Sequence, residues 1–144
     1  MSKIANLNPI GEYEKDFHGW LVCNAQLLKS ARLDEIDTIN LAEELDSMGK
    51  KQRHELMSRL KIVLLHLLKW KFQARYRSGS WNVMLLEQRQ QLAELLEESP
   101  SLRGDIQSKF NKAYSMARKL AAAETGLPLE SFPERCPYPL WIRY

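Results

Sequence analysis

Carboxylates and histidines near the middle of the chain could form a metal site or an acid–base site. Glu43 and Glu44 precede Gly49, while His54 and His66 follow it. A carboxylate beside an imidazole can bind a metal ion or relay a proton. If the chain folds back at Gly49 into a helical hairpin, Glu44 would face His54. A metal-dependent or acid–base function built on these four side chains is therefore one hypothesis.

The spacing of the histidines argues against a metal site. His54 and His66 are twelve residues apart, which turns them about 120° from each other around one helix. Helical motifs that bind a metal through two histidines normally place them three or four residues apart. His66 also lies within an apolar run, where a core histidine hydrogen-bonded to a carboxylate is the commoner outcome. We expect no cofactor.

Nucleophilic catalysis has less support. Cys23 follows His18 by five residues, which separates the two side chains by about 140° around a helix. No serine lies in a glycine-rich elbow, and no glycine pattern forms a phosphate-binding loop. Cys23 and Cys136 are expected to be reduced thiols, because no secretory signal is recognised. The sequence therefore indicates no catalytic residue and disfavours an enzyme.

Cations alternate with aromatic residues in the stretch KWKFQARYR at 69–77. The segment 50–90 carries ten Lys or Arg and two Glu, a net charge of +8. Cations that bind phosphates and aromatics that stack on bases are typical of a nucleic-acid groove. The candidate residues here are Lys71, Arg75, Tyr76, Arg77 and Arg89. However, Trp70 continues an apolar helical stripe, and a total charge of +3 is a weak electrostatic signature, so nucleic-acid binding is the alternative hypothesis.

Segregated charge favours binding to a protein partner or to a second copy. Residues 1–49 carry four Lys or Arg and nine Asp or Glu, a net charge of −5. Trp141 and Arg143, near the end of the chain, have the composition of interface hot spots. The favoured hypothesis is a small, non-enzymatic interaction or regulatory module.

Apolar residues recur at helical spacing almost throughout, which predicts an all-α fold. The first helix is expected over residues 12–31, and the second from the N-cap Asp37. Gly49 offers a break or a kink. The third helix, from about residue 50 to 72 or 74, is apolar around most of its circumference and should be central. The inward positions expected in the first two helices are Phe17, Trp20, Leu21, Asn24, Leu27, Leu28, Leu41, Leu45 and Met48.

Two further helices and a tail complete the expected fold. Ser80 can cap a helix ending near Glu98, and Ser101 can cap one ending at Gly126. Residues 127–144 contain four of the six prolines and several aromatics, so we expect an extended tail packed on the bundle. The predicted architecture is a single all-α domain over 1–144. It is an up-and-down bundle of four to five helices with a long central third helix and a proline-rich aromatic extension.

Membrane association is not expected. The longest apolar stretch, at 62–68, is too short to span a bilayer. The first residues lack the apolar segment and cleavage site of a signal peptide. We therefore expect a cytoplasmic protein without a membrane partner.

Four ordered motifs carry a family resemblance. They are NLAEELDSMGKKQRHEL, LLHLLKWKFQ, RSGSW and AAAETGLPLESFPERCPYPL. Over residues 13–140 the chain resembles the bacterial, especially cyanobacterial, family known as domain of unknown function twenty-nine. The resemblance implies a compact helical bundle and supplies no activity.

Overall fold

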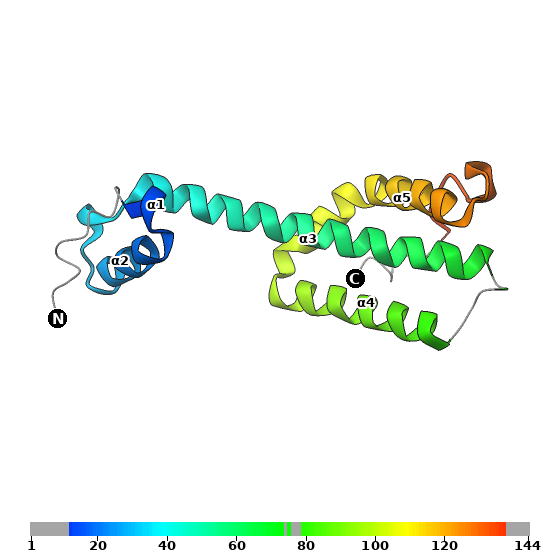
Figure 1. The fold of residues 1–144 in the computed structure, drawn as a ribbon, viewed down its shortest axis with the longest axis horizontal. Helices are drawn as coiled ribbons and strands as arrows, with labels where there is room; N and C mark the ends of the chain where they lie inside the picture. The colour runs from blue at the N-terminus through cyan, green and yellow to red at the C-terminus, as the bar shows by residue number, and fades with distance from the viewer. Residues whose placement is uncertain (1–11, 74, 76–78, 138–144) are drawn as a thin grey trace. The chain divides into compact units, whose positions relative to one another are not determined.

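The computed structural model describes residues 12–73, 75 and 79–137, and every regular element in these ranges is helical (Figure 1). The α-helices are α1 (Glu12–Lys15), α2 (Phe17–Lys29), α3 (Thr38–Phe72), α4 (Gly79–Glu98) and α5 (Arg103–Thr125). Three short 3₁₀ turns are η2 (Leu33–Glu35), η4 (Pro100–Leu102) and η5 (Leu129–Ser131). The predicted fold class, an all-α bundle with a long central helix, is confirmed.

The chain forms two compact units, unit 1 (Met1–Lys50) and unit 2 (Lys51–Tyr144). Unit 1 contains α1, α2, η2 and the beginning of α3, and unit 2 contains the remainder. The expectation of a single domain over the whole chain stays a prediction.

Helix α3 continues without interruption through Gly49 for 35 residues. The helix break considered at this glycine, and the hairpin that would depend on it, are therefore wrong. Glycine inside a helix is about 1 kcal/mol less favourable than alanine. That penalty is small beside the good helix formers on both sides, which are the Leu, Ala and Glu residues of 41–45 and the Lys, Gln, Arg, Glu and Leu residues of 50–61.

Helix starts depend on two capping carboxylates. The Asp16 carboxylate accepts a hydrogen bond from the backbone N–H of Gly19 (3.0 Å), and a Cβ at Gly19 would collide with that carboxylate. This cap divides the helix expected over 12–31 into α1 and α2. Asp37 caps α3 as predicted, because its Oδ1 accepts from the N–H of Asn40 (3.3 Å). Ser101, predicted to cap the fifth helix, instead lies in η4, which leads directly into α5.

Unit 2 has an apolar core made by one face each of α4 and α5 around the second half of α3. Most of the α3 circumference is buried there, as its sequence predicts. The core residues are Leu56, Leu60, Val63, Leu64, Leu65, Leu67 and Leu68 of α3, Leu85, Leu92, Leu95 and Leu96 of α4, and Ile106, Phe110, Ala113, Tyr114, Ala117 and Ala121 of α5. Continuous burial of this kind supplies the main stabilisation of a helical bundle.

The described residues after α5, 126–137, pack on this bundle with Phe132 as an aromatic anchor. Phe132 is buried and contacts the ring of Phe72 edge-on, with centroids 5.4 Å apart. Arg118 Nε donates a hydrogen bond to the Phe132 carbonyl (3.0 Å), and the Tyr114 hydroxyl donates to the Pro133 carbonyl (2.5 Å). Buried polar groups of the tail are thus paired with α5 side chains.

Candidate docking surface

A buried hydrogen-bond network ties α2 to the start of α3 in unit 1. Trp20 is fully buried, and its Nε1 donates to Asp37 Oδ2 (2.9 Å). The backbone N–H of Asp37 donates to Asn24 Oδ1 (2.9 Å), and Asn40 Nδ2 donates to Asp37 Oδ2 (2.7 Å). Each of these groups is occupied in positioning the two helices.

Hydrogen bonding keeps the Asp37 carboxyl ionised. Burial alone would raise its pKa, but the hydrogen bonds from Asn40 and Trp20 outweigh burial and lower the pKa below its ordinary value. An ionised carboxylate is also favourable at the N-terminus of α3. Asp37 therefore stabilises the start of α3, and its proton affinity is too low for a general base near neutral pH.

Two further aromatic rings, those of Tyr13 and Phe17, lie beside Trp20 of this network. The Tyr13 ring contacts Trp20 and Phe17 edge-on, with centroid distances of 4.9 and 5.9 Å, and Phe17 stacks on Trp20 at 5.6 Å. The Tyr13 hydroxyl donates to Glu44 Oε1 of α3 (2.5 Å). This hydrogen bond, with smaller contributions from desolvation and from the negative charges of Glu44, Glu14 and Glu43, raises the pKa of Tyr13 to about 12. Carboxylates thus gather around Tyr13.

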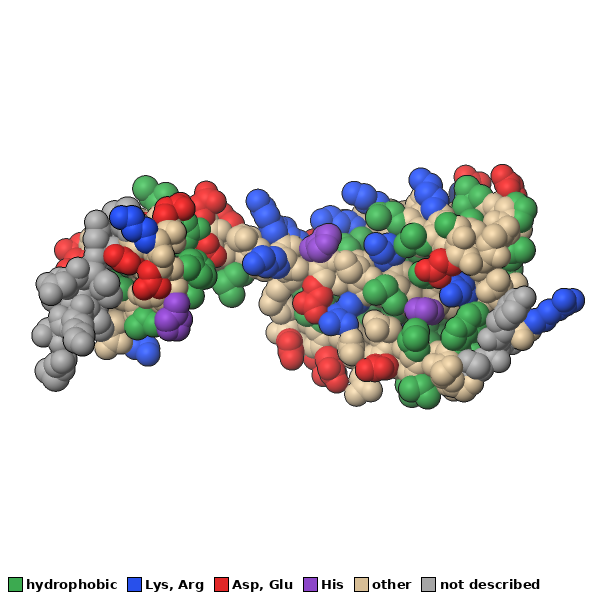
Figure 2. All heavy atoms as spheres, viewed as in Figure 1, with side chains coloured by type: hydrophobic (Ala, Val, Ile, Leu, Met, Phe, Trp, Pro, Cys, Tyr) green, Lys and Arg blue, Asp and Glu red, His purple; other side chains and the backbone are tan. Residues whose placement is uncertain are grey.

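Several apolar side chains of unit 1 that were expected to point inward are exposed. The exposed fractions are 45% for Phe17, 41% for Leu21, 62% for Leu45 and 60% for Met48. Leu41 is half-buried. Hydrophobic side chains and carboxylates lie next to each other on the surface of unit 1 (Figure 2). The prediction of an inward position is wrong for these four residues and for Leu28, which is 47% exposed, because none of the described helices of unit 1 covers these side chains.

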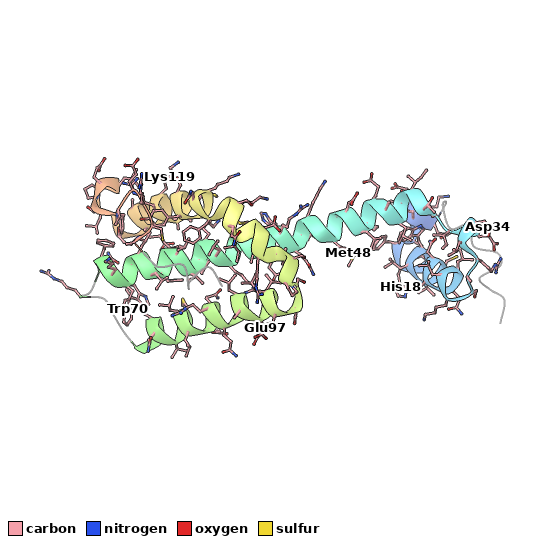
Figure 3. All side chains as sticks on the ribbon, turned by 180° about the vertical axis from the view of Figure 1, so that it is seen from behind. His18, Asp34, Met48, Trp70, Glu97 and Lys119 are labelled. Atoms are coloured by element: carbon pink, nitrogen blue, oxygen red, sulfur yellow. The ribbon has the colours of Figure 1, made fainter. Side chains whose placement is uncertain are left out.

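Tyr13 links the apolar side chains on the surface of α2 to those on the surface of α3. Phe17 and Leu21 lie one turn apart on α2, and the Tyr13 ring contacts Phe17. The Tyr13 hydroxyl reaches Glu44, which lies about one turn from both Leu41 and Met48 on α3. Figure 3 labels Met48 at this part of α3. We name Phe17, Leu21, Leu41, Leu45 and Met48 the unit 1 docking surface.

The residues predicted to meet a partner are placed only in part. Lys71 is exposed, with Nζ 5.7 Å from the centroid of the Phe72 ring, and Arg75 is also exposed. Arg89 is half-buried. The remaining predicted residues, Tyr76, Arg77, Trp141 and Arg143, lie outside the described residues. The exposure of Lys71 and Arg75 agrees with a binding role, which stays a prediction.

Some cations of the basic segment are paired within the chain. Arg59 forms an ion pair with Glu55 (2.9 Å), and Lys69 forms one with Glu124 of α5 (3.1 Å). Lys69 Nζ also lies 5.1 Å from the ring centroid of Trp81. These partners differ from those expected from a hairpin at Gly49. Trp70 and Trp81 are half-buried, so neither offers a fully open ring for stacking, and nucleic-acid binding by 50–90 stays a prediction.

The proposed metal residues do not have the predicted arrangement. Glu44 and His54 are almost three turns apart on one continuous helix, since a turn takes about 3.6 residues. Glu43 and His54 are exposed. His66 is half-buried, and burial together with Lys69 lowers its pKa, an effect partly offset by Glu124. Within the part of the chain that the structure describes, no three His, Cys, Asp or Glu side chains are grouped to hold a metal ion.

A family model described as "Domain of unknown function DUF29" matches residues 12–141. The chain belongs to the DUF29 family. The resemblance in the motifs is thereby confirmed, and the family description assigns no activity. No curated protein and no solved structure matches the chain. In the described portion of this DUF29 chain, none of the helices combines the length and the apolar character needed to cross a bilayer.

The sequence contained one signal for the docking surface. The apolar positions 41, 45 and 48 are followed by the apolar face of 56–68 at helical spacing, as expected for a single continuous helix. A continuous α3 places the first group in unit 1, where, among residues 12–50, α1, α2 and η2 are the elements available to cover it. If Gly49 is interpreted as a helix break, the exposure of this group is not predicted.

Proposed function

We propose that this DUF29 protein is a cytoplasmic, non-enzymatic interaction module that binds its partner through the unit 1 docking surface. The observation that supports the proposal is the exposure of Phe17, Leu21, Leu45 and Met48 on two neighbouring helices. Single exposed apolar residues are ordinary, whereas a contiguous group with polar residues around it is typical of an interaction site. Two helices side by side can receive an amphipathic helix from a partner.

Charge indicates the kind of partner. Residues 1–50 contain nine Asp or Glu and five Lys or Arg, a net charge of −4. Near the docking surface, Glu14, Glu43 and Glu44 act together on the Tyr13 hydroxyl. Complementary charge selects partners and suppresses wrong ones. We therefore propose that the partner presents an apolar helical face bordered by Lys or Arg.

Enzymatic roles for the ionisable groups of unit 1 have less support. Asp37 is held in its ionised form by Trp20 and Asn40, and Tyr13 is held in its protonated form by Glu44. Both groups therefore resist proton exchange near neutral pH. A binding role uses the shape and charge of the surface and requires no proton transfer.

Site-specific photo-crosslinking tests the proposal in cells that produce the protein. A photoreactive amino acid at position 45 should capture a protein partner. The matched control is position 39, since Ile39 is 78% exposed on the same helix but lies outside the docking surface. Equal capture at both positions, or none at position 45, would contradict the proposal. Met48→Glu should weaken capture at position 45, because it places a charge in the apolar contact.

A further inference from the structure

The outer face of α5 is apolar and basic. Met116 and Leu120 are exposed large apolar residues on this helix. The exposed lysines on the same side of α5 are Lys109, Lys112 and Lys119. Steps of three and four residues place such side chains on one face of a helix, and the buried residues of α5 occupy the neighbouring face. Lys119 is labelled on α5 in Figure 3, and Lys and Arg side chains gather over this part of unit 2 in Figure 2.

This face has the composition expected of the partner. Residues 51–144 contain sixteen Lys or Arg and nine Asp or Glu, a net charge of +7, against −4 for unit 1. Pairing two unit 1 docking surfaces would bring like charges together, whereas pairing one with the α5 face joins opposite charges. Apolar contact by Met116 and Leu120 would bury part of the exposed surface on both sides.

We propose that a second copy of this chain occupies the unit 1 docking surface through the outer face of its α5. This inference rests on the proposed function and names its partner. Each copy carries both surfaces, so any two copies can form this contact.

Charge reversal provides the first part of the test. The mass of the full-length protein is measured by light scattering during size-exclusion chromatography, and the dimer dissociation constant by analytical ultracentrifugation. Glu14→Lys with Glu43→Lys, and separately Lys112→Glu with Lys119→Glu, should each raise the dissociation constant about ten-fold or more. Combining the four changes should restore most of the dimer, because the opposite charges meet again.

A matched control separates local contact from total charge. Arg75→Glu with Arg135→Glu alters two exposed cations of unit 2 that lie outside α5 and changes the net charge as much as the α5 variant. This control should leave the dissociation constant within about two-fold of the original value, since it lies outside both surfaces. Circular dichroism on every variant confirms that helix content is preserved. The original dimer should also weaken as ionic strength rises.

Each of the following outcomes would overturn the inference. A protein that is monomeric at all measurable concentrations excludes the dimer, and so does failure of the combined charge reversal to recover mass. If Lys112→Glu with Lys119→Glu releases co-purified nucleic acid and leaves the mass unchanged, the α5 face binds nucleic acid instead. A monomer whose position 45 still captures another protein would preserve the proposed function while rejecting the second copy. The absence of capture at position 45 would reject both.

Discussion

Unit 1 and unit 2 hold their helices together by different means. The interior of unit 2 is almost entirely apolar, with leucines from α3 and α4 packed against Ile106 and Phe110 of α5. Among the buried residues of unit 1 are Asn24 and Asp37, which hydrogen-bond to each other and to Trp20. At the same time unit 1 leaves Leu45 and Met48 exposed. The buried polar network positions α2 and the start of α3, while apolar side chains of both helices stay exposed.

The difference predicts unequal stability. Each buried Leu or Phe side chain contributes about 1.5–3 kcal/mol, and unit 2 has many of them, whereas unit 1 has few. Neutral hydrogen bonds contribute only about 0.5–1.5 kcal/mol net. Unit 1 should therefore open locally before unit 2 unfolds, as the less stable parts of proteins commonly do. Binding of a partner to unit 1 would then stabilise the unit by mass action.

The largest expected effect is in the core of unit 2. Leu64→Ala should lower the free energy of unfolding by about 2–5 kcal/mol, because Leu64 is fully buried and its removal leaves a cavity. Chemical denaturation measures the loss. If each unit is stabilised independently of the other, hydrogen exchange of the α2 amides in unit 1 should be almost unchanged. Leu86→Ala, at an exposed position of α4, should change stability by less than about 0.5 kcal/mol.

A smaller loss is expected from the polar network of unit 1. Trp20→Phe retains an aromatic ring but removes the N–H that donates to Asp37. The loss should be about 1.5–3 kcal/mol, the range for hydrogen bonds to charged groups. Faster hydrogen exchange confined to α2 and the start of α3 would confirm it. If exchange in α5 rises equally, the comparison between the two units is wrong.

The same network predicts a pH dependence for unit 1. Because the folded pKa of Asp37 is below its unfolded value, ionised Asp37 stabilises the folded unit above the unfolded pKa of about 3.9. This stabilisation should disappear as the pH falls through the folded pKa. Trp20→Phe should show a weaker dependence in the same acid range.

The contact between α5 and the tail is expected to contribute less. Tyr114→Phe removes the hydroxyl that donates to the Pro133 carbonyl, so unit 2 should lose about 0.5–1.5 kcal/mol. Burial raises the pKa of Tyr114 to about 12. The original protein should therefore lose stability as the pH rises from about 10 through 12, whereas Tyr114→Phe should lack that part of the alkaline loss. Identical alkaline profiles would contradict the buried position of the hydroxyl.

Helical periodicity was sufficient for the class of fold and for the core of unit 2. Leu56, Leu60 and Val63 follow a strict helical stripe, and all three are buried. The N-cap of α3 could also be predicted, since Asp37 is a favourable N-cap residue. These features depend on interactions between residues near one another in the sequence.

Features that depend on tertiary packing could not be read in the same way. An apolar stripe shows that a helix has something to bury, but it does not show whether the chain provides a covering helix. Among the described residues, no helix covers Leu45 and Met48. The Trp20 to Asp37 hydrogen bond joins residues 17 apart through a turn that no local pattern specifies. The candidate site was missed for these reasons.

Gly49 provides the smallest and most specific test, because it lies beside the boundary between the two units and inside the helix that they share. No atom would contact a Cβ at this position, so Gly49→Ala should stabilise the protein by about 0.5–1 kcal/mol through reduced chain entropy. Slower hydrogen exchange of α3 amides on both sides of residue 49 would locate the effect. The matched control is Gly126→Ala, which should destabilise by a similar amount, because Gly126 has a φ of 72°. A loss of stability in Gly49→Ala would mean that the helix is interrupted at residue 49, and the exposure of Leu45 and Met48 would then need another cause.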